Sequence, residues 1–323
     1  MSATRIETLA RKHNVTNYIN GAVNANLIGD AFYVAPMVRT GSLVNTVWKY
    51  SRTSPFRIPD TRRALGGKAA RVDFGGTTED LTLETHALDT GIDVVAQSDE
   101  EIVMNLQSQV NLTTQLASLA HYDRVLTLVN AAATAASAID ISTDDALTPS
   151  FQIVNTLNAH IKTILLSCGS FAPSTKVRFL WGFEAAKLMM SSLEFKNRVN
   201  GGATSANPVS NSITAGLDVL SKMLVIPNTE HRICTAIKDT GEQAASSESR
   251  AFVNDSSLLI FAASENPTKE DPSAFKTFWK GSEGMDTRYY KSEDQRIENF
   301  GLDWAYKVYT ANAGAAIKLT VQA

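Results

Sequence analysis

The residues best suited to chemistry are five histidines and two cysteines, and their spacing matches no common site. No two histidines stand four residues apart, which is the spacing that places two metal ligands on one helical face. Cys168 and Cys234 lack both CxxC spacing and nearby histidine partners. We therefore expect two small core cysteines in a reducing cytoplasm, although a disulfide between them stays open. The histidines are His13, His86, His121, His160 and His231.

Other signatures of catalysis are missing as well. The sequence contains no GxxxxGK[S/T] phosphate loop, GxGxxG fingerprint, HExxH or GxSxG motif. Asp140, Asp144 and Asp145 stand close together, but the glycine and terminal glutamate of a calcium loop are absent. We predict no catalytic, cofactor-binding or metal-binding residue. Carboxylates distant in sequence could still meet in space, so an enzyme remains an alternative.

Composition narrows the class of partner. The chain has 323 residues, 30 Lys and Arg against 33 Asp and Glu, and a formal net charge of -3. A protein that grips nucleic acid normally carries a basic excess, so we expect any contact with double-stranded DNA to be loose and non-specific. No apolar stretch approaches the ~18 residues of a membrane span, and the N-terminus lacks the apolar core of a signal peptide.

Charge is segregated along one region of the chain. Residues 49–71 hold seven basic residues and one acid, whereas residues 73–101 hold nine acids and no Lys or Arg. Such a pattern suits pairing between copies of one chain, although charge runs are usually solvated surface. DNA binding by the basic segment is less favoured, because it holds few aromatic residues that could stack on bases.

The elements that position these charges begin with an arm and a hairpin. Residues 1–43 are rich in Asn and Gly, which favours turns, and Phe32–Val38 reads as a short extended segment. An arm with so few core residues would need partners elsewhere. Residues 44–97 predict two strands, Val44–Tyr50 and an alternating segment at 80–88, that flank a long irregular tip. An isolated hairpin is marginal in water and needs another surface.

A long helix follows. Ser98 and Glu101 form a capping box, and no Pro or Gly interrupts the chain to about Ala136. We expect one apolar face to be buried along this spine. The residues assigned to that face are Ile102, Leu106, Val110, Leu116, Leu119, Leu126 and Val129, broadened by Val103, Leu112 and Val125.

The remaining chain predicts a mixed α/β region and a return to strands. We expect helices at 148–169 and 183–190, and strands at 176–182, 222–227 and 257–263. From residue 286 onward the pattern alternates, with Trp304, Tyr306 and Val308 on one face. We expect the last strand, near 315–321, to close a sheet beside the long helix.

This order of elements resembles the major capsid proteins of tailed bacteriophages, which share the Hong Kong 97-type fold with encapsulin shells. The resemblance covers nearly the whole chain. It is carried by NLIGDAFYVAPMV before the hairpin, FRIPDTRRALGGKAARVDF at the tip, ALDTGIDVVAQSDEE before the long helix and FGLDWAYKVYTANAGAAIKL near the end.

The resemblance implies an α+β fold with an N-terminal arm (1–43), an extended hairpin loop (44–97), a peripheral domain (98–139 and 286–323) and an axial domain (140–285). It implies that the loop reaches over a neighbouring copy. The candidate contact residues are Arg57, Arg62, Arg63, Lys68 and Arg71 at the tip, and Asp99, Glu100 and Glu101 on the neighbour.

The resemblance further implies partners and a location. The chain would form hexamers and pentamers of a closed icosahedral shell in the virion, assembled in the host bacterial cytoplasm. A separate scaffolding protein, a portal and a decoration protein would accompany it, with no membrane and no cofactor. Two alternatives stay open, namely an encapsulin-type compartment and an enzyme whose site lies in the α/β region.

Overall fold

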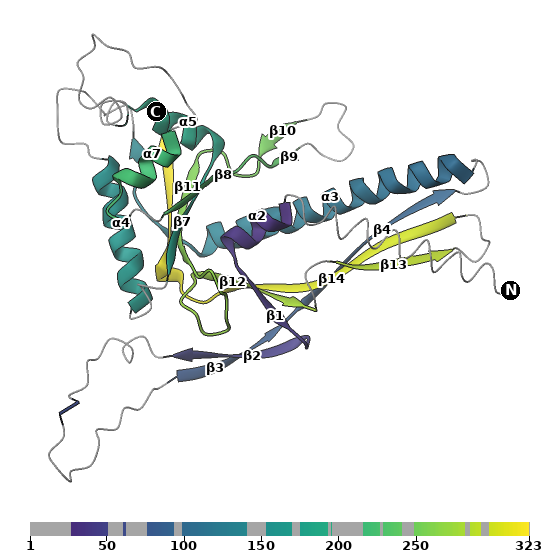
Figure 1. Ribbon diagram of the computed structural model, residues 1–323, viewed down its shortest axis with the longest axis horizontal. Coiled ribbons are helices and arrows are strands. Elements are labelled where there is room, and N and C mark those ends of the chain that lie inside the picture. Colours follow the sequence, from purple (N-terminus) through teal and green to yellow (C-terminus); the bar gives the residue numbers. More distant parts are fainter. Residues whose placement is uncertain are drawn as a thin grey trace. The chain divides into compact units, whose positions relative to one another are not determined.

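The chain divides into two compact units in a computed structural model (Figure 1). The first unit comprises residues 1–44, 82–128 and 277–308, and the second comprises residues 45–81, 129–276 and 309–323. The structure describes residues 27–50, 61–62, 76–93, 99–140, 153–169, 175–192, 195, 216–226, 229–240, 249–281, 285–291 and 297–322.

The first unit is a helix laid on a five-stranded sheet. The sheet runs β1 (Met37–Thr40), β12 (Phe275–Lys280), β14 (Ile297–Thr310), β13 (Asp286–Lys291), and β4 (Glu84–Asp93) also pairs with β14. The pairing of β1 with β12 is parallel, whereas β13 and β4 run antiparallel to β14. The long helix α3 (Asp99–Ala132) and the short helix α2 (Leu27–Val34) cover the sheet.

The core of this unit forms where α3 meets the aromatic residues of the sheet. Val110 and Ala117 of α3 contact a cluster that includes Trp279, Phe300 and Tyr306. Trp304 and Val308 pack against the same cluster, which confirms the predicted apolar face of this strand.

The predicted hairpin is present, but its second strand is not the segment expected, because residues 84–88 of the predicted strand 80–88 belong to β4 and pair with β14. Strands β2 (Val44–Tyr50) and β3 (Gly76–Thr82) pair as a two-stranded sheet of their own. Asn45 and Val47 are buried and alternate with exposed neighbours, as the two-residue period of a strand requires. The predicted tip lies mostly outside the described residues.

The second unit is built on a six-stranded sheet. Its order is β5 (Thr134–Ala135), β15 (Ala316–Gln322), β11 (Ser257–Ala263), β7 (Lys176–Trp181), β8 (Glu230–Ile233), and β6 (Ile139–Asp140) also pairs with β15. Strand β11 is central and buried over Leu258–Ala263, which explains its continuous apolar sequence. The short strands β9 (Ile237–Asp239) and β10 (Arg250–Phe252) form a separate antiparallel pair.

Helices of the second unit match their predicted positions. Helix α4 (Ile153–Cys168) buries the apolar stripe of its sequence and ends at Gly169, whose φ of 64° is accessible to glycine at little cost. Helix α5 (Phe183–Ser191) follows β7 as predicted. The unit also contains α7 (Gly216–Met223) and the 3-10 turn η4 (Ala313–Ala315). Cys168 and Cys234 are both buried reduced thiols, as expected for core cysteines.

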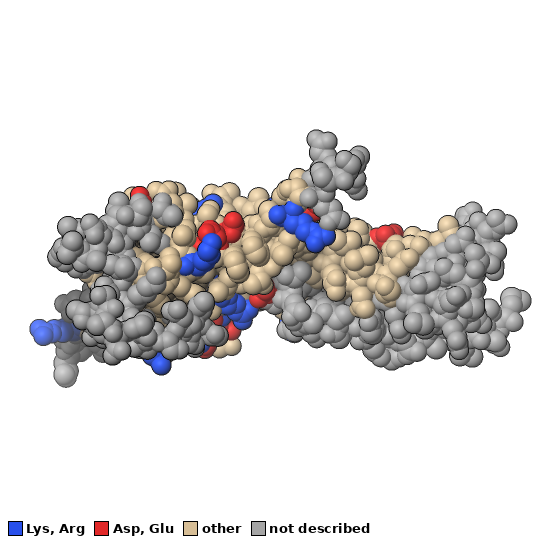
Figure 2. Space-filling view, turned by 90° about the horizontal axis from the view of Figure 1, so that it is seen from above, with Lys and Arg blue, Asp and Glu red and all other residues tan. Residues whose placement is uncertain are grey.

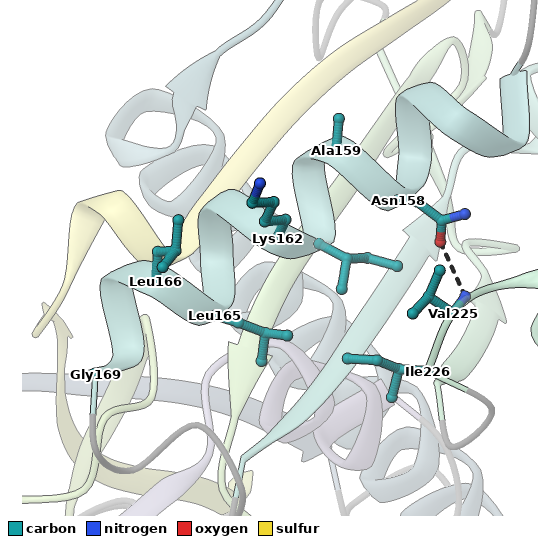
Figure 3. Close-up of a pocket in the computed structure, with 9 residues that line it drawn as sticks. Asn158, Ala159, Lys162, Leu165, Leu166, Gly169, Val225 and Ile226 are labelled. Carbon is teal, nitrogen blue, oxygen red and sulfur yellow. Dashed lines mark hydrogen bonds between the residues drawn. The ribbon is translucent and has the colours of Figure 1, made fainter.

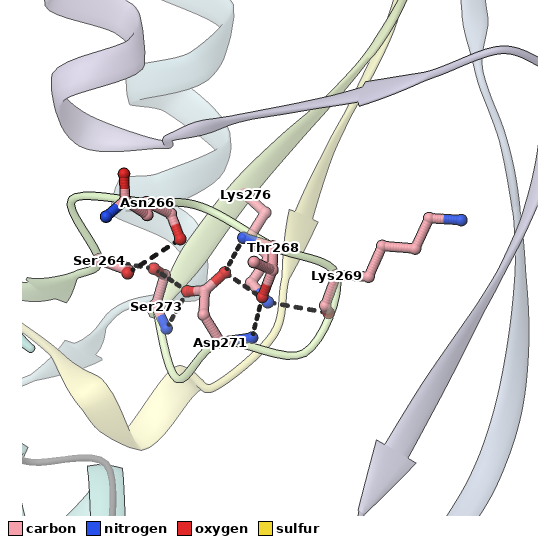
Figure 4. Close-up of polar contacts among 7 residues, drawn as sticks. All are labelled: Ser264, Asn266, Thr268, Lys269, Asp271, Ser273 and Lys276. Atoms are coloured by element: carbon pink, nitrogen blue, oxygen red, sulfur yellow. Dashed lines mark hydrogen bonds and ion pairs between the residues drawn. The ribbon is translucent and has the colours of Figure 1, made fainter. Parts of the chain in front are cut away.

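A buried ion pair organises the loop between β11 and β12 (Figure 4). Lys276 Nζ lies 3.1 Å from Asp271 Oδ2, and both side chains are almost inaccessible to water. Asp271 accepts hydrogen bonds from the backbone N–H groups of Thr268 and Ser273, while Lys276 also donates to the carbonyl of Lys269. Every polar group of the pair therefore has a partner, which a buried charge requires.

Two sequence expectations are wrong. Residues 32–34 belong to α2 rather than to an extended segment, because a short apolar run has no period that separates helix from strand. The segment 222–227 is not a strand, since α7 continues to Met223 and residues 224–226 form a bend. Strand β15 pairs with β11 in the sheet of the second unit, and residues 309–323 fall in that unit.

The described end of the arm finds its partners elsewhere in the same chain. Ala31, Val34, Ala35 and Val38 are buried within their own unit, and β1 pairs with β12. This part of the arm therefore needs no second copy. The capping residue Ser98 and residues 1–26 lie outside the described residues.

Candidate assembly interface

Helix α3 buries an unexpected face. The residues it turns inward include Thr113, Thr114, Ser118 and His121, all nearly inaccessible, beside Val110 and Ala117. Small side chains let the helix approach the sheet closely, and the large aromatic residues of β12 and β14 supply the volume. Between residues 113 and 118 the inward face of the helix is thus built from small and partly polar side chains.

Two leucines of α3, Leu112 and Leu116, lie on the opposite face. Leu112 and Leu116 are one turn apart, and their side chains are 58% and 52% exposed. Both had been assigned to the buried face, so that prediction is wrong for these two residues, while Val110, Leu126 and Val129 are buried as expected. A pair of adjacent exposed leucines on a rigid helix is a surface that gains free energy when another surface covers it.

Strand β2 presents a second apolar surface. Val44 and Trp48 are exposed on the same side of the strand, four residues apart, and Thr46 stands between them. Thr46 Oγ1 donates a 2.6 Å hydrogen bond to Asp80 Oδ1 on β3, which links the two strands on this exposed side. The hairpin therefore offers a partner an apolar strand surface supported by polar contacts.

A buried histidine lies beneath α3. The rings of Phe32, Trp279 and Tyr306 surround His121, with centroids 5.9, 5.5 and 4.4 Å away. Neither ring nitrogen of His121 has a hydrogen-bond partner. Burial, together with His86 and Arg124 nearby, lowers the pKa of His121 to about 3. His121 is consequently neutral at physiological pH and acts as a packing residue.

Ion pairs tie α3 to the sheet at its surface. Lys307 Nζ of β14 lies 2.5 Å from Glu84 Oε1 of β4, and Arg124 of α3 pairs with the same carboxylate. The hydrogen bond from Lys307, with Arg124 close by, lowers the pKa of Glu84. Thr90 of β4 adds a 3.0 Å hydrogen bond to Gln109 of α3. These contacts position the helix so that its leucines face outward.

The predicted contact charges are only partly visible. Arg62 is exposed, whereas Arg57, Arg63, Lys68 and Arg71 lie outside the described residues. Asp99, Glu100 and Glu101 form the first turn of α3, but their side chains are also outside the described set. Pairing between copies therefore stays a prediction. The exposed leucines of α3 were missed, although their four-residue spacing was readable in the sequence.

The described surface carries charges of both signs. Figure 2 shows Lys and Arg beside Asp and Glu in small mixed groups on the face that it presents. Within the described ranges, no group of three or more His, Cys, Asp or Glu residues could hold a metal ion. No helix among these residues is long and apolar enough to cross a membrane.

Known structures resemble this fold, although no protein-family model and no curated protein sequence matches the chain. A phage-related protein from Bordetella bronchiseptica RB50 aligns over 95% of this chain and 95% of its own length, with a TM-score of 0.65 at 13% identity. The chain of a virus-like particle from Pyrococcus furiosus aligns over 94% of this chain and 98% of its own length, with a TM-score of 0.53 at 8% identity. The capsid structure of cyanophage P-SCSP1u aligns over 89% of this chain and 86% of its own chain, with a TM-score of 0.50 at 11% identity.

The chain has the fold of a viral capsid protein. This confirms the α+β capsid fold predicted from the order of elements. Helix α3 and the β2–β3 hairpin, with their exposed apolar residues, are parts of this fold.

Proposed function

We propose that this chain is the major capsid protein of a tailed bacteriophage, a structural subunit without catalytic activity that assembles into a closed icosahedral shell. The observation that carries the proposal is the outward-facing Leu112 and Leu116 of α3 in a chain with a capsid fold. A monomer in water gains nothing from exposed leucines on a rigid helix, whereas a lattice of copies buries them at every repeat.

The covering element that we propose is the hairpin of a neighbouring copy. Val44 and Trp48 of β2 would lie on the leucines of α3. The basic tip would then lie near the acidic start of the same helix. Its residues are Arg57, Arg62, Arg63, Lys68 and Arg71, and the acidic residues are Asp99, Glu100 and Glu101.

The stability of such a shell would come from repetition. One exposed ion pair contributes only about 0–1 kcal/mol. Apolar contact contributes roughly 25 cal/mol per Å² of buried surface, and each copy would make the contact both as donor and as acceptor. We infer hexamers and pentamers of this chain, accompanied by a separate scaffolding protein, a portal and a decoration protein, and loose contact with the packaged double-stranded DNA. The location that follows is the virion, after assembly in the host bacterial cytoplasm.

Electron microscopy of the purified chain, produced alone and together with its scaffolding protein, tests the proposal. We expect large closed particles of uniform diameter. If both preparations contain only monomers or dimers at micromolar concentration, the shell proposal is wrong.

An encapsulin-type compartment is the second candidate. It is favoured by the likeness to the Pyrococcus furiosus virus-like particle, which extends over 98% of that chain. The contents of particles purified from the native source distinguish the phage capsid from the encapsulin-type compartment. A long double-stranded DNA molecule supports the phage capsid, and a single cargo protein with no DNA supports the compartment.

A further inference from the structure

An apolar groove opens on the second unit between α4 and the bend after α7 (Figure 3). It encloses about 700 Å³. Leu165 and Leu166 line one wall, and Val225 and Ile226 line the other. Asn158 Oδ1 of α4 accepts a 3.0 Å hydrogen bond from the backbone N–H of Val225, which holds the two walls together.

The mouth of the groove is apolar and open. Leu166 is 65% exposed and Val225 is 78% exposed. Both are among the most exposed large apolar side chains of the described residues. An apolar surface held in place by a hydrogen bond is suited to receive an apolar protrusion of similar width.

The same unit carries an apolar protrusion. Ile237 of β9 stands opposite Phe252 of β10 in the antiparallel register, so their side chains share one face. Phe183, at the start of α5, stacks on Phe252 with ring centroids 4.8 Å apart and planes 11° apart. Ile237 is 50% exposed, and Phe183 is exposed as well. These three residues are the β9–β10 patch.

We propose that the β9–β10 patch of one copy docks into the α4 groove of the next copy, as a head-to-tail contact within a ring of subunits. The inference rests on the proposed shell function and names one specific contact for it. A ring requires two different surfaces on each subunit, one that donates and one that accepts. Figure 1 shows α4 on one side of strands β7 and β11, and β9 and β10 on the other side. The two surfaces therefore do not overlap.

Charge favours the same pairing. Lys162 lies one turn before Leu166 on α4 and is exposed at the groove. Asp239 lies two residues after Ile237 on β9, so it is exposed on the same side of that strand. When Ile237 meets Leu166, the carboxylate and the ammonium come to the same edge of the contact. Asp239 Oδ1 accepts the N–H of Ser249, which positions the carboxylate in the hairpin.

Engineered disulfides test the contact in the assembled protein. The variant Leu166→Cys with Ile237→Cys should give a ladder of covalent oligomers under oxidising conditions, because each copy is linked to the next. Cys168 and Cys234 are buried, and burial raises the pKa of Cys168 to about 12, so the native thiols react slowly. Lys269→Cys with Ile237→Cys is the matched control, since Lys269 is exposed on a different loop.

Exchanging the two charges gives a second, independent test of the docking contact. Lys162→Glu or Asp239→Lys alone should lower the yield of particles severalfold, and the double variant should recover most of it. Particles that form normally while Leu166→Cys with Ile237→Cys gives no ladder, or no more than the control, would overturn the docking and leave the shell function intact. Absence of particles from the unmodified chain would instead count against the shell function itself. Two single variants that assemble as well as the parent would also overturn the docking.

Discussion

Asp89 and Arg288 form an ion pair across a strand that has no side chain at the crossing point. Asp89 of β4 and Arg288 of β13 both stand opposite Gly301 of the intervening strand β14. Arg288 Nη2 lies 3.1 Å from Asp89 Oδ1, and Arg288 also pairs with Asp303. A Cβ atom at Gly301 would stand 2.1 Å from Asp89 Oδ1. Glycine at 301 therefore allows the outer strands to be bridged.

Replacing that glycine should separate the pair. We expect Gly301→Ala to lower the free energy of unfolding by about 1 kcal/mol, because the Asp89 side chain must move and an exposed pair contributes no more than this. In an Asp89→Ala background the same change should be neutral or slightly stabilising, since alanine loses less backbone entropy than glycine on folding. Urea unfolding of the four proteins gives the coupling energy. Equal effects of Gly301→Ala on the free energy of unfolding in both backgrounds would contradict the claim that Gly301 leaves room for the Asp89–Arg288 ion pair.

The buried pair Lys276–Asp271 should be sensitive to which partner is removed. Burial lowers the pKa of Lys276, and the Asp271 carboxylate opposes that effect. Asp271→Ala leaves an ammonium group in the interior and should destabilise the protein by about 3–5 kcal/mol. Lys276→Met should cost less, because the backbone groups of Thr268 and Ser273 still bind the carboxylate.

The control for this series is an exposed pair. Lys187 and Glu184 lie 2.9 Å apart on α5 with the lysine largely in water. Lys187→Met should change the melting temperature by no more than about 1 °C, as exposed helix pairs contribute little. If Asp271→Ala melts at the same temperature as Lys187→Met, the burial argument fails.

His121 should make the first unit sensitive to acid. Its pKa is lowered to about 3 in the folded chain from an ordinary value of 6.5. The unfolded chain therefore binds the extra proton more readily, so this residue's contribution is present above pH 6.5 and declines as the pH falls towards 3. The decline approaches about 1.4 kcal/mol per pH unit within that window.

His121→Leu removes this dependence while leaving an apolar side chain in the aromatic cage. The difference in unfolding free energy between the parent and the variant, measured in urea at pH 8, 6, 5 and 4, should shift steadily in favour of the variant as the pH falls. Other titrating groups, including His86 and Glu84 beside the cage, are common to both proteins and cancel to first order. Parallel stability curves would contradict the prediction.

The outer face of α3 should matter to assembly but not to the fold. Leu112→Asp with Leu116→Asp should leave the free energy of unfolding in urea within about 0.5 kcal/mol of the parent value, because much of each side chain is already in water. The same variant should fail to form particles under conditions in which the parent assembles. Ser108→Asp with Gln115→Asp, at other exposed positions of α3, is the matched control for added charge. Normal particles from the leucine variant would exclude this face from the interface.

The charged hairpin tip should respond to salt and to sign reversal. We expect Arg57→Glu with Arg62→Glu and Arg63→Glu to reduce particle yield severalfold at low ionic strength, and less at 1 M salt, where the Debye length falls to about 3 Å. Changing Asp99, Glu100 and Glu101 to Lys in the same chain should restore part of the yield. Recovery stays partial because cations at a helix N-terminus are unfavourable. Light scattering during assembly measures both effects. If the changes to Lys restore no particle yield at any salt concentration, the basic tip does not contact the acidic start of α3.

Much of the local structure was readable from the chain alone. An uninterrupted 34-residue helix followed from the absence of Pro and Gly, and the buried strand β11 followed from its unbroken apolar run. The end of α4 at Gly169 and the strand Val44–Tyr50 were also predicted correctly, whereas the partner strand of the hairpin lies at 76–82 and not at 80–88. In each case neighbouring residues carry the signal, because backbone propensity and side-chain period act over a few residues.

The tertiary structure decided which surfaces meet. The sequence of α3 carries apolar residues on more than one side, so periodicity alone did not show that Thr114 and His121 face the sheet while Leu112 faces water. Strand β15 alternates equally well for either sheet, and only its register with Leu258 and Ile260 assigns it to the second unit. Faces and strand partners depend on the shapes of residues hundreds of positions away, and such contacts leave no mark in a local pattern.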